Sequence, residues 1–478
     1  MRETCALASR PLPRNRRRSL TTLLAMMLGL TTVLLFGGYI RDINYAMQTD
    51  FVKLTGHLQV QHRDYFRFGS GNPAAYGVKD YRRLLDTVRA DPVLAPMLVV
   101  ATPTLQFGAI AGNFAAGVSR PVLVTGVDVD GQNLMRQWNA YGQRVLSRPL
   151  SLSGTATDAA VIGVGVARVL QLCQPLKVPD CEGAPPPPAA AGLSPSAADG
   201  AAATLPPDIA GLADLGAAPA AAAPSASPSG PRIELLAAST RGAPNVAAVR
   251  VERAEFQGIK ELDDAHVGLH LSQAQQLVFG AGEPQVTAIA IQLKQTSQMQ
   301  AARERLTQLL ASDFAAQPLA VVDYEVLNPF YGQTLAMFAA IFGFISVLIS
   351  AIVLFTVSNT MSMAVVERTV EIGTLRAIGL RQKGIRAMFL TEGIVLGCFG
   401  AVLGILAALA LAEGINGLGL TWIPPGRVEH VALAVRLTGE NALMLANAAG
   451  LIVVAALSAL LPATRAARMN IVDALRHV

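Results

Sequence analysis

The sequence predicts a membrane protein with four transmembrane α-helices and a large α+β extracytoplasmic domain between helices 1 and 2. Composition is the first observation behind this prediction, because 52% of the 478 residues are hydrophobic and only 15% are charged, unlike an ordinary soluble protein. The second is a set of four apolar stretches, each long enough to cross a hydrocarbon core as a helix. The third is the placement of Lys and Arg, which gather at the ends of these stretches.

Each predicted membrane helix lies in a stretch of at least the roughly 20 apolar residues that one span needs. The stretch that contains helix 2 continues to Val366 and is longer than a span, so part of it should project beyond the bilayer. None of the four has an acidic or basic residue at its centre, which argues against a proton or ion relay in the membrane. The predicted helices are helix 1 at 19–40, helix 2 at 331–357, helix 3 at 388–412 and helix 4 at 441–462.

Basic residues predict the orientation of these helices, because Lys and Arg near the ends of spans stay on the cytoplasmic side. Arginines precede helix 1, fill the connection between helices 2 and 3, and follow helix 4 at Arg465 and Arg468. These three regions, including both termini, are therefore expected in the cytoplasm. Residues 41–330 and the connection 413–440 are expected outside. The net charge of +5 reflects the basic flanks, so it gives no reason to expect a nucleic-acid partner.

A cleaved signal peptide is the alternative for the N-terminus, because a basic region precedes an apolar stretch there. The stretch 19–40 is long for the apolar core of a signal peptide, and no A-x-A cleavage site follows it. We therefore expect residues 1–18 to form a cytoplasmic tail and helix 1 to remain as an uncleaved anchor.

Residues 41–330 mix two kinds of periodicity and are expected to form one periplasmic α+β domain. Apolar residues recur at helical spacing in 78–91 and 297–312, whereas short apolar runs between them indicate strands. The runs 97–105 and 107–112 are interpreted as separate strands, because Gly and Pro punctuate them. Both ends of the domain continue into membrane helices, so these ends must lie near each other.

The composition changes within this domain at 183–231, where Ala, Pro, Ser and Gly dominate. Such a segment buries too little apolar surface to offset the entropy cost of ordering it. We expect a disordered insertion or an extended tether here, with no core of its own.

Two of the four cysteines, Cys173 and Cys181, fall in the segment expected outside, where the environment is oxidising. Cys5 is expected in the cytoplasm and Cys398 in a membrane helix. A short-loop disulfide between Cys173 and Cys181 is therefore favoured, and two unpaired thiols in a mobile loop remain the alternative.

The connection from Met361 to Gly393 is the most informative segment. It mixes apolar residues such as Val370 and Ile372 with charged residues such as Glu371 and Arg376, as short amphipathic helices on a membrane surface do. This surface could be a loop that follows the membrane, or a docking surface for a partner whose movement is passed to the spans. Three glycines are expected to break the segment into pieces: Gly373, Gly379 and Gly384.

Motifs in this connection and near the C-terminus resemble the permease domain of the FtsX/MacB family of ABC transporters, which includes the lipoprotein-releasing LolC and LolE subunits. The resemblance covers residues 331–478, interpreted as an FtsX-like permease domain, and extends more weakly to a MacB-like periplasmic domain. The matching motifs stand in the family's order: Asn359, Glu367-Arg368, Glu371-Ile372-Gly373, Arg376-Ala377-Ile378-Gly379, Glu392-Gly393, Gly400, Pro462, Arg465-Ala466 and Ala474-Leu475-Arg476.

The resemblance implies a multi-pass permease subunit in the bacterial inner membrane. In this family two permease copies, or a permease and a homologous one, assemble with two copies of a separate ABC ATPase. A short cytoplasmic helix after the second span docks on that ATPase. By motif position this coupling role falls on Glu367, Arg368, Glu371, Ile372, Arg376 and Ala377. Surface ion pairing or anchoring at lipid headgroups is the alternative for these residues.

We expect no catalytic residues, cofactor or metal site in this chain. No G-x-x-x-x-G-K-[ST] phosphate loop occurs in the sequence, so ATP is expected to be hydrolysed by the partner. His266 and His270 stand four residues apart but lack further ligands nearby, and are interpreted as solvated surface histidines. Small residues in helix 3 permit close packing against another helix, which the sequence does not identify: Gly393, Gly397, Gly400 and Gly404.

The sequence supports three functional hypotheses. The first is an ABC permease that performs conformational work outside the membrane, in the export or release of a lipoprotein, a lipid or another amphipathic substrate. The second is an FtsX-like regulator that transports nothing and activates a periplasmic cell-wall hydrolase. The third is a membrane-anchored sensor without an ATPase. The large outer domain favours the first over the second, and the docking-like connection disfavours the third.

Overall fold

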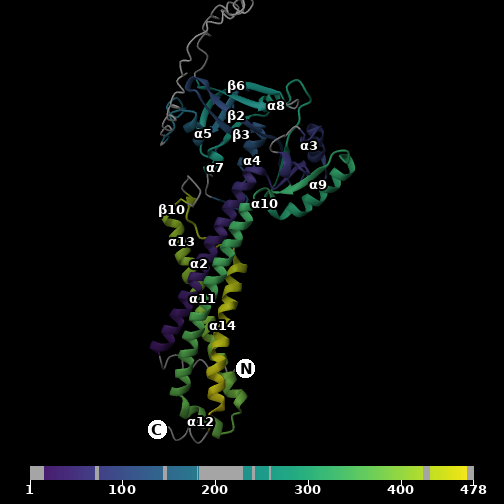
Figure 1. Cartoon of the computed structure of the whole chain (residues 1–478). Helices are drawn as coiled ribbons and strands as arrows, with labels where there is room; N and C mark the ends of the chain where they lie inside the picture. Colours follow the sequence, from purple (N-terminus) through teal and green to yellow (C-terminus); the bar gives the residue numbers. More distant parts are fainter. Residues whose placement is uncertain are drawn as a thin grey trace, which may run out of the picture.

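The computed structural model describes residues 16–69, 75–143, 148–179, 181, 230–239, 243–257, 260–423 and 431–470. The chain forms a long helix bundle with a sheet domain at one end (Figure 1). The predicted tail before Arg16, most of the insertion 183–231, and residues 471–478 lie outside the described residues.

Four helices of the bundle are long and apolar enough to cross a membrane, which confirms this part of the predicted fold class. α13 packs on α14 and α2, and α11 packs on the same two helices, so α2 and α14 separate α11 from most of α13. The helices are α2 (Arg16–Thr55), α11 (Pro329–Glu367), α13 (Gln382–Leu418) and α14 (Asn441–Arg468).

α2 differs from the prediction for helix 1, because it continues well past residue 40 and ends only at Thr55. No proline interrupts the polar segment from Arg41 to Thr55, so nothing in it stops the helix. Gly56 then ends it with φ +76°, a conformation that disfavours a side chain. Residues 41–55 therefore form a helical stalk and not the start of the sheet domain.

Six strands of the sheet domain pair in a closed ring, in the order β2, β3, β7, β4, β6, β5 and back to β2. Their buried side chains, among them Phe107, Ile162 and Leu235, form one core together with residues of α5 and α8. The elements are β2 (Leu98–Asn113), β3 (Val118–Val127), β4 (Ala159–Gly163), α5 (Val164–Val169), β5 (Arg232–Ala238), β6 (Pro244–Glu255), β7 (His266–His270) and α8 (Leu271–Phe279).

A second core lies where β2 leaves the ring and continues the sheet through β8, β1 and β9. The helices α3 and α9 contribute buried residues such as Leu84 and Leu306 to it. Asp91, after α3, accepts hydrogen bonds from Arg305 of α9, which keeps the pKa of this carboxyl below its usual range. The elements are β1 (Leu58–His62), α3 (Tyr81–Ala90), β8 (Ala288–Leu293), α9 (Met299–Asp313) and β9 (Leu319–Asp323).

β2 joins the two cores and corrects a sequence-based prediction. The runs 97–105 and 107–112 were expected as separate strands, yet β2 is continuous over 16 residues. Its first part, from Leu98 to Thr104, pairs with β8, and its second part, from Thr104 to Asn113, pairs with β3. Pairing along its whole length therefore outweighs the local preference of Pro103 and Gly108 for a break.

The two chain segments that connect the bundle with the sheet domain enter adjacent strands. α2 leads through Gly56 into β1, and β9 leads through α10 (Tyr324–Leu327) into α11. β1 and β9 pair antiparallel, with Leu58 opposite Asp323. The sequence argument that the ends of this domain lie near each other agrees with this pairing.

His57 is fully buried at this entry point. Its Nδ1 accepts a hydrogen bond from the Leu293 N–H at 3.1 Å, and its ring lies edge-to-face on Trp138 with centroids 5.0 Å apart. Burial lowers the pKa of His57 to about 4, because desolvation disfavours the charged imidazolium.

The buried His57 predicts that acid destabilises the sheet domain. The unfolded chain takes up a proton near pH 6.5 and the folded chain only near pH 4, so stability falls as pH decreases through this window. For a shift of this size the loss between pH 7 and pH 5 is about 2 kcal/mol. Unfolding of the full chain in detergent, followed by Trp138 emission in a Trp422→Phe background, measures it. His57→Asn should remove about this much of the pH dependence; an unchanged pH dependence would contradict the assignment.

Candidate functional site

The helix α12 (Thr369–Ala377) lies at the end of the bundle opposite the sheet domain, between α11 and α13 (Figure 1). α11 ends because Arg368 leaves helical geometry, with φ −108° and ψ 18°. The Thr369 hydroxyl then donates to the Val366 carbonyl at 2.8 Å. Gly379, with φ +108°, ends the segment in a conformation that a side chain disfavours. Local geometry thus sets α12 apart as a separate short helix.

One side of α12 is buried against three helices of the bundle. Ile372, only 1% exposed, packs with Val365 of α11, Phe389 of α13 and Ala466 of α14 in one apolar cluster. Gly373 is also buried and lies inside the helix. The prediction that Gly373 breaks this segment is therefore wrong, because α12 continues without interruption from Thr369 to Ala377.

Two arginines fasten the ends of α12 to neighbouring helices. Arg368 Nη1 lies 3.3 Å from Glu392 Oε2 of α13 in a largely buried ion pair. Arg376 Nη1 donates to the carbonyl of Met469, the residue that caps α14. The sequence argument placed Glu392 within an apolar stretch and gave it no partner. A buried carboxylate is tolerated there because a guanidinium lies beside it.

The other side of α12 is exposed. Glu371, Ala377 and the apolar Val370 lie on it, and Glu367 at the end of α11 and Ile378 just after α12 are exposed as well; Val370 and Ile378 are 48% and 80% exposed. The structure thus divides the six predicted docking residues. Glu367, Glu371 and Ala377 face outward, whereas Arg368, Ile372 and Arg376 hold the helix in place. Sequence reasoning did not include the exposed Val370 and Ile378 among the docking residues.

The four glycines of α13 contact two different helices. A Cβ at Gly393 would lie 2.9 Å from the Ala459 Cβ of α14, and one at Gly400 would lie 2.8 Å from the Met26 Cβ of α2. Gly397 likewise approaches α14, and Gly404 approaches α2. Close approach of helix backbones requires such small residues. α13 is therefore packed between its two neighbours along the predicted membrane span.

At the opposite end of the bundle, residues 431–440 form a strap across α2. The Arg436 N–H donates to the Gly38 carbonyl at 3.1 Å, and its guanidinium lies 5.1 Å from the Tyr45 ring centroid. The same guanidinium donates to the carbonyl of Tyr141 in the sheet domain. The Tyr45 hydroxyl donates to Glu440 Oε1 at 2.8 Å. Arg436 thus contacts the stalk and the sheet domain at once.

Further contacts continue this junction into the sheet domain. Gln48 of the stalk donates to the Tyr324 hydroxyl at 2.7 Å, and the Tyr331 hydroxyl donates to Asn44 at 2.6 Å. Val52 and Trp138 complete a buried cluster with these two tyrosines. Packed side chains therefore connect α2 and α11 with the sheet domain.

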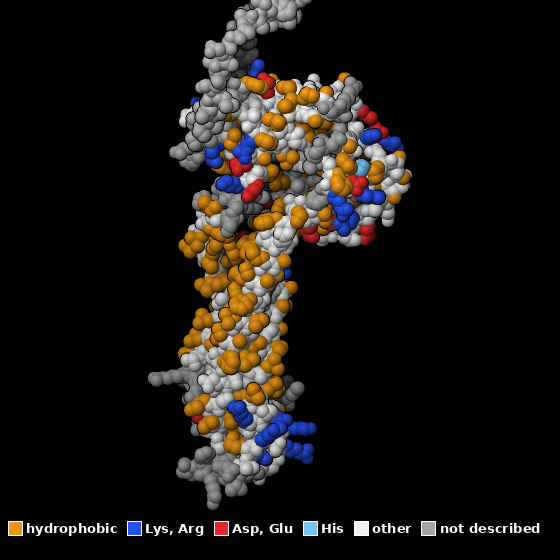
Figure 2. Space-filling model, in the orientation of Figure 1, with side chains coloured by type: hydrophobic (Ala, Val, Ile, Leu, Met, Phe, Trp, Pro, Cys, Tyr) orange, Lys and Arg blue, Asp and Glu red, His pale blue; other side chains and the backbone are white. Residues whose placement is uncertain are grey.

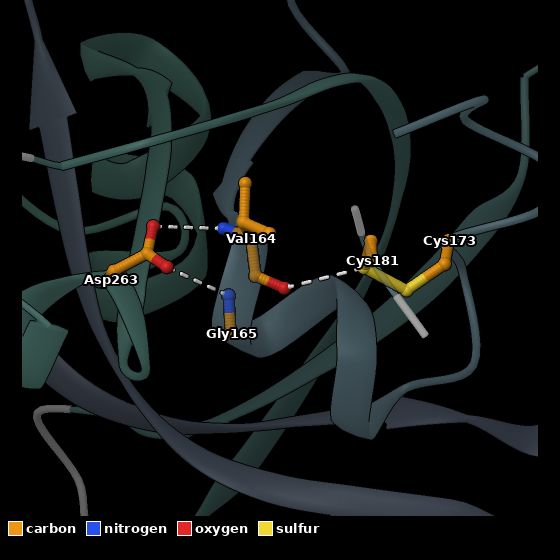
Figure 3. The surroundings of a disulfide bond; sticks show 5 residues. All are labelled: Val164, Gly165, Cys173, Cys181 and Asp263. Atoms are coloured by element: carbon orange, nitrogen blue, oxygen red, sulfur yellow. Dashed lines mark hydrogen bonds between the residues drawn. A yellow bond between two sulfur atoms is a disulfide. The ribbon is translucent and has the colours of Figure 1, made fainter. Parts of the chain in front are cut away.

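Figure 3 shows the disulfide that joins Cys173 and Cys181, whose Cα atoms are 5.5 Å apart. It lies beside the first turn of α5, where Asp263 accepts hydrogen bonds from the N–H groups of Val164 and Gly165 at 2.9 and 3.0 Å. The disulfide and the carboxylate fix both sides of this turn. The loop that precedes the insertion is thereby attached to the core.

His266 and His270 do not match their interpretation as solvated surface residues. Both lie on strand β7 and are partly buried, and burial lowers the pKa of each, that of His266 to about 4. His270 Nε2 lies 3.0 Å from the Thr155 hydroxyl. Within the described part of the chain no group of His, Cys, Asp or Glu could hold a metal ion.

The helix bundle contains the part of the chain that matches a known protein family. A family model named FtsX-like permease C-terminal matches residues 341–471, which include α12, α13 and α14. This part of the chain is similar to the C-terminal domain of FtsX-like permeases. The resemblance derived from the motifs is therefore confirmed for it. Of the residues that form the site, all six predicted docking residues and Glu392 fall within this FtsX-like permease domain.

Several relatives of this chain carry names that describe ABC transporter permeases. An uncharacterized permease of Methanocaldococcus jannaschii is 30% identical over 33% of this chain and 39% of its own length. The Bacillus subtilis permease YvrN is 28% identical over 48% of this chain and 54% of its own. The macrolide export ATP-binding/permease protein MacB of Escherichia coli is 28% identical over 30% of this chain and 23% of its own. Each match thus covers between about a quarter and a half of the relative's own length.

Glycine packing in the FtsX-like permease domain predicts a position-dependent cost of adding one methyl group. Gly393→Ala places Cβ against Ala459, so the bundle should lose about 1 to 3 kcal/mol of stability. Gly414→Ala in the same helix meets nothing within 4 Å of the described residues, and should leave stability unchanged or slightly raised. Thermal unfolding of both variants in detergent tests the packing. Equal effects of the two substitutions would show that Gly393 is not a contact residue.

Proposed function

We propose that this chain is the permease subunit of an ABC transporter and that a separate ATPase subunit docks on the exposed side of α12. The end of the bundle with α12, together with both termini, lies in the cytoplasm of a bacterial cell, and the sheet domain lies outside the inner membrane. Two permeases, identical or homologous, assemble with two ATPase subunits. The family match to residues 341–471 and the names of the relatives support this assignment.

One observation carries the proposal. α12 is held by Ile372, Arg368 and Arg376 to three long helices, while its other side presents Glu371 and Val370. A helix that lay on the membrane surface through its own apolar side chains would not need these contacts with the bundle. A partner that binds the exposed side instead moves α11, α13 and α14 together, as a coupling element must.

The work is done at the sheet domain, in the export or release of a lipid-linked or otherwise amphipathic substrate. The stalk of α2 and the start of α11 connect to adjacent strands of that domain, and Arg436 ties the strap to the stalk and to the sheet domain. ATP-driven displacement of α12 therefore reaches the outer domain along rigid helices. The name of the relative MacB, which describes macrolide export, supports transport of a substrate over regulation alone.

An FtsX-like regulator of a periplasmic cell-wall hydrolase is the second candidate. The family match favours it as much as it favours a transporter, because it covers the bundle and not the sheet domain. The two differ in what the moving sheet domain binds, a transported substrate or a hydrolase.

The exposed carboxylate of Glu371 predicts a separable docking defect. Glu371→Lys should reduce the amount of ATPase that co-purifies with the tagged chain from native membranes, and the ATP hydrolysis rate of the complex. The thermal stability of the chain itself should change by less than about 1 kcal/mol, because an exposed charge contributes little to folding. Arg376→Glu should lower both docking and thermal stability, since it removes the contact with Met469.

Glu413→Lys is the matched control, because Glu413 is an exposed carboxylate at the other end of α13. It should leave docking and hydrolysis at the level of the unmodified chain. If Glu371→Lys behaves like Glu413→Lys in both assays, α12 is not the docking surface.

A further inference from the structure

A groove of about 300 Å³ lies between α13 and α14, close to the end of the bundle with α12. Lys383, Arg386 and Leu390 line it from α13, spaced three or four residues apart on one helix face. Leu460 and Thr464 line it from α14 with the same spacing. Residues of both helices thus line the groove.

The charge of this groove is one-sided. Lys383 and Arg386 are basic, and none of the described residues that line it is acidic. The Nε of Arg386 is buried and makes no hydrogen bond to any other described residue. A buried donor without an acceptor costs free energy. An acceptor from outside the chain would satisfy it, and a phosphate oxygen suits a guanidinium in charge and geometry.

The groove changes from basic to apolar along its length. Lys383 and Arg386 lie in the first two turns of α13, nearest the end of the bundle, whereas Leu390 and Leu460 lie further along the predicted spans. Figure 2 shows Lys and Arg side chains gathered at this end, next to the apolar surface of the bundle. A phosphate near the two basic residues would thus carry its attached chain along Leu460, which is 43% exposed.

We propose that this groove is a binding site for an anionic phospholipid, with its phosphate at Lys383 and Arg386 and an acyl chain along Leu390 and Leu460. A free phosphate would use only the basic end. The inference goes beyond the proposed function, and it rests on the bundle crossing a membrane rather than on the ATPase. Its failure would therefore leave the docking proposal untouched.

Native mass spectrometry of the full chain in a neutral detergent, titrated with phosphatidylglycerol or phosphatidylcholine, tests the site. The unmodified chain should bind phosphatidylglycerol preferentially. Each positive charge removed should weaken that binding about fivefold, so Lys383→Gln with Arg386→Gln should weaken it roughly 25-fold. The control pair Arg381→Gln with Arg468→Gln removes equal charge from exposed positions at the same end, outside the groove, and should retain the preference.

Ala387→Phe provides a second variant that keeps both charges, because Ala387 is an exposed residue of the groove wall. Its ring should fill the groove and abolish the preference for phosphatidylglycerol. This variant decides the question if the double substitution does not fold. The proposal is overturned if Ala387→Phe binds phosphatidylglycerol as the unmodified chain does, if both charge pairs weaken binding equally, or if inorganic phosphate competes as effectively as the lipid.

Discussion

The burial of Ile372 against α11, α13 and α14 is the contact on which the arrangement of the bundle end depends. Removing such a side chain from water contributes about 1.5 to 3 kcal/mol, whereas an exposed ion pair contributes about 0 to 1 kcal/mol. Apolar anchoring therefore outweighs any surface pairing of Glu367 or Glu371. Arg368 and Arg376 then fix the direction of α12, because each makes a contact at one of its ends. The carboxylates of Glu367 and Glu371 remain exposed.

Close helix packing extends this constraint along the bundle. Gly393 and Gly397 bring α13 against α14, and Gly400 brings it against α2. α2 continues as a stalk to Thr55, and only Gly56 and His57 separate it from β1. The strap at Arg436 closes the other end by holding stalk and sheet domain together. Rigidity of this kind suits a protein that passes movement across a membrane.

The sequence predicted much of the fold, because membrane helices need long apolar runs and these are directly visible. It also located the α12 segment. It could not separate the predicted docking residues into exposed and buried ones, because Glu367 and Arg368 are adjacent and both polar. Arg368 points into the bundle because Glu392 of α13 lies beside it, and Arg376 does so because it contacts the Met469 carbonyl at the end of α14. Neither partner is near these arginines in the sequence. The continuity of β2 was missed for a similar reason. The strands that pair with it on either side of Thr104, β8 and β3, keep it extended past Pro103. The sequence likewise could not show which helices pack on Gly393 and Gly400, because tertiary contacts decide this.

The central claim is that α12 is a fixed part of the bundle. Amide hydrogen exchange of the full chain in detergent tests it most directly, because exchange reports the free energy of local opening. The account predicts that the amides of α12 that bond within the helix exchange nearly as slowly as those in the first turns of α13, and that Ile372→Asn accelerates exchange in α12 selectively. Exchange in α12 as fast as in an open loop, unchanged by Ile372→Asn, would contradict the account.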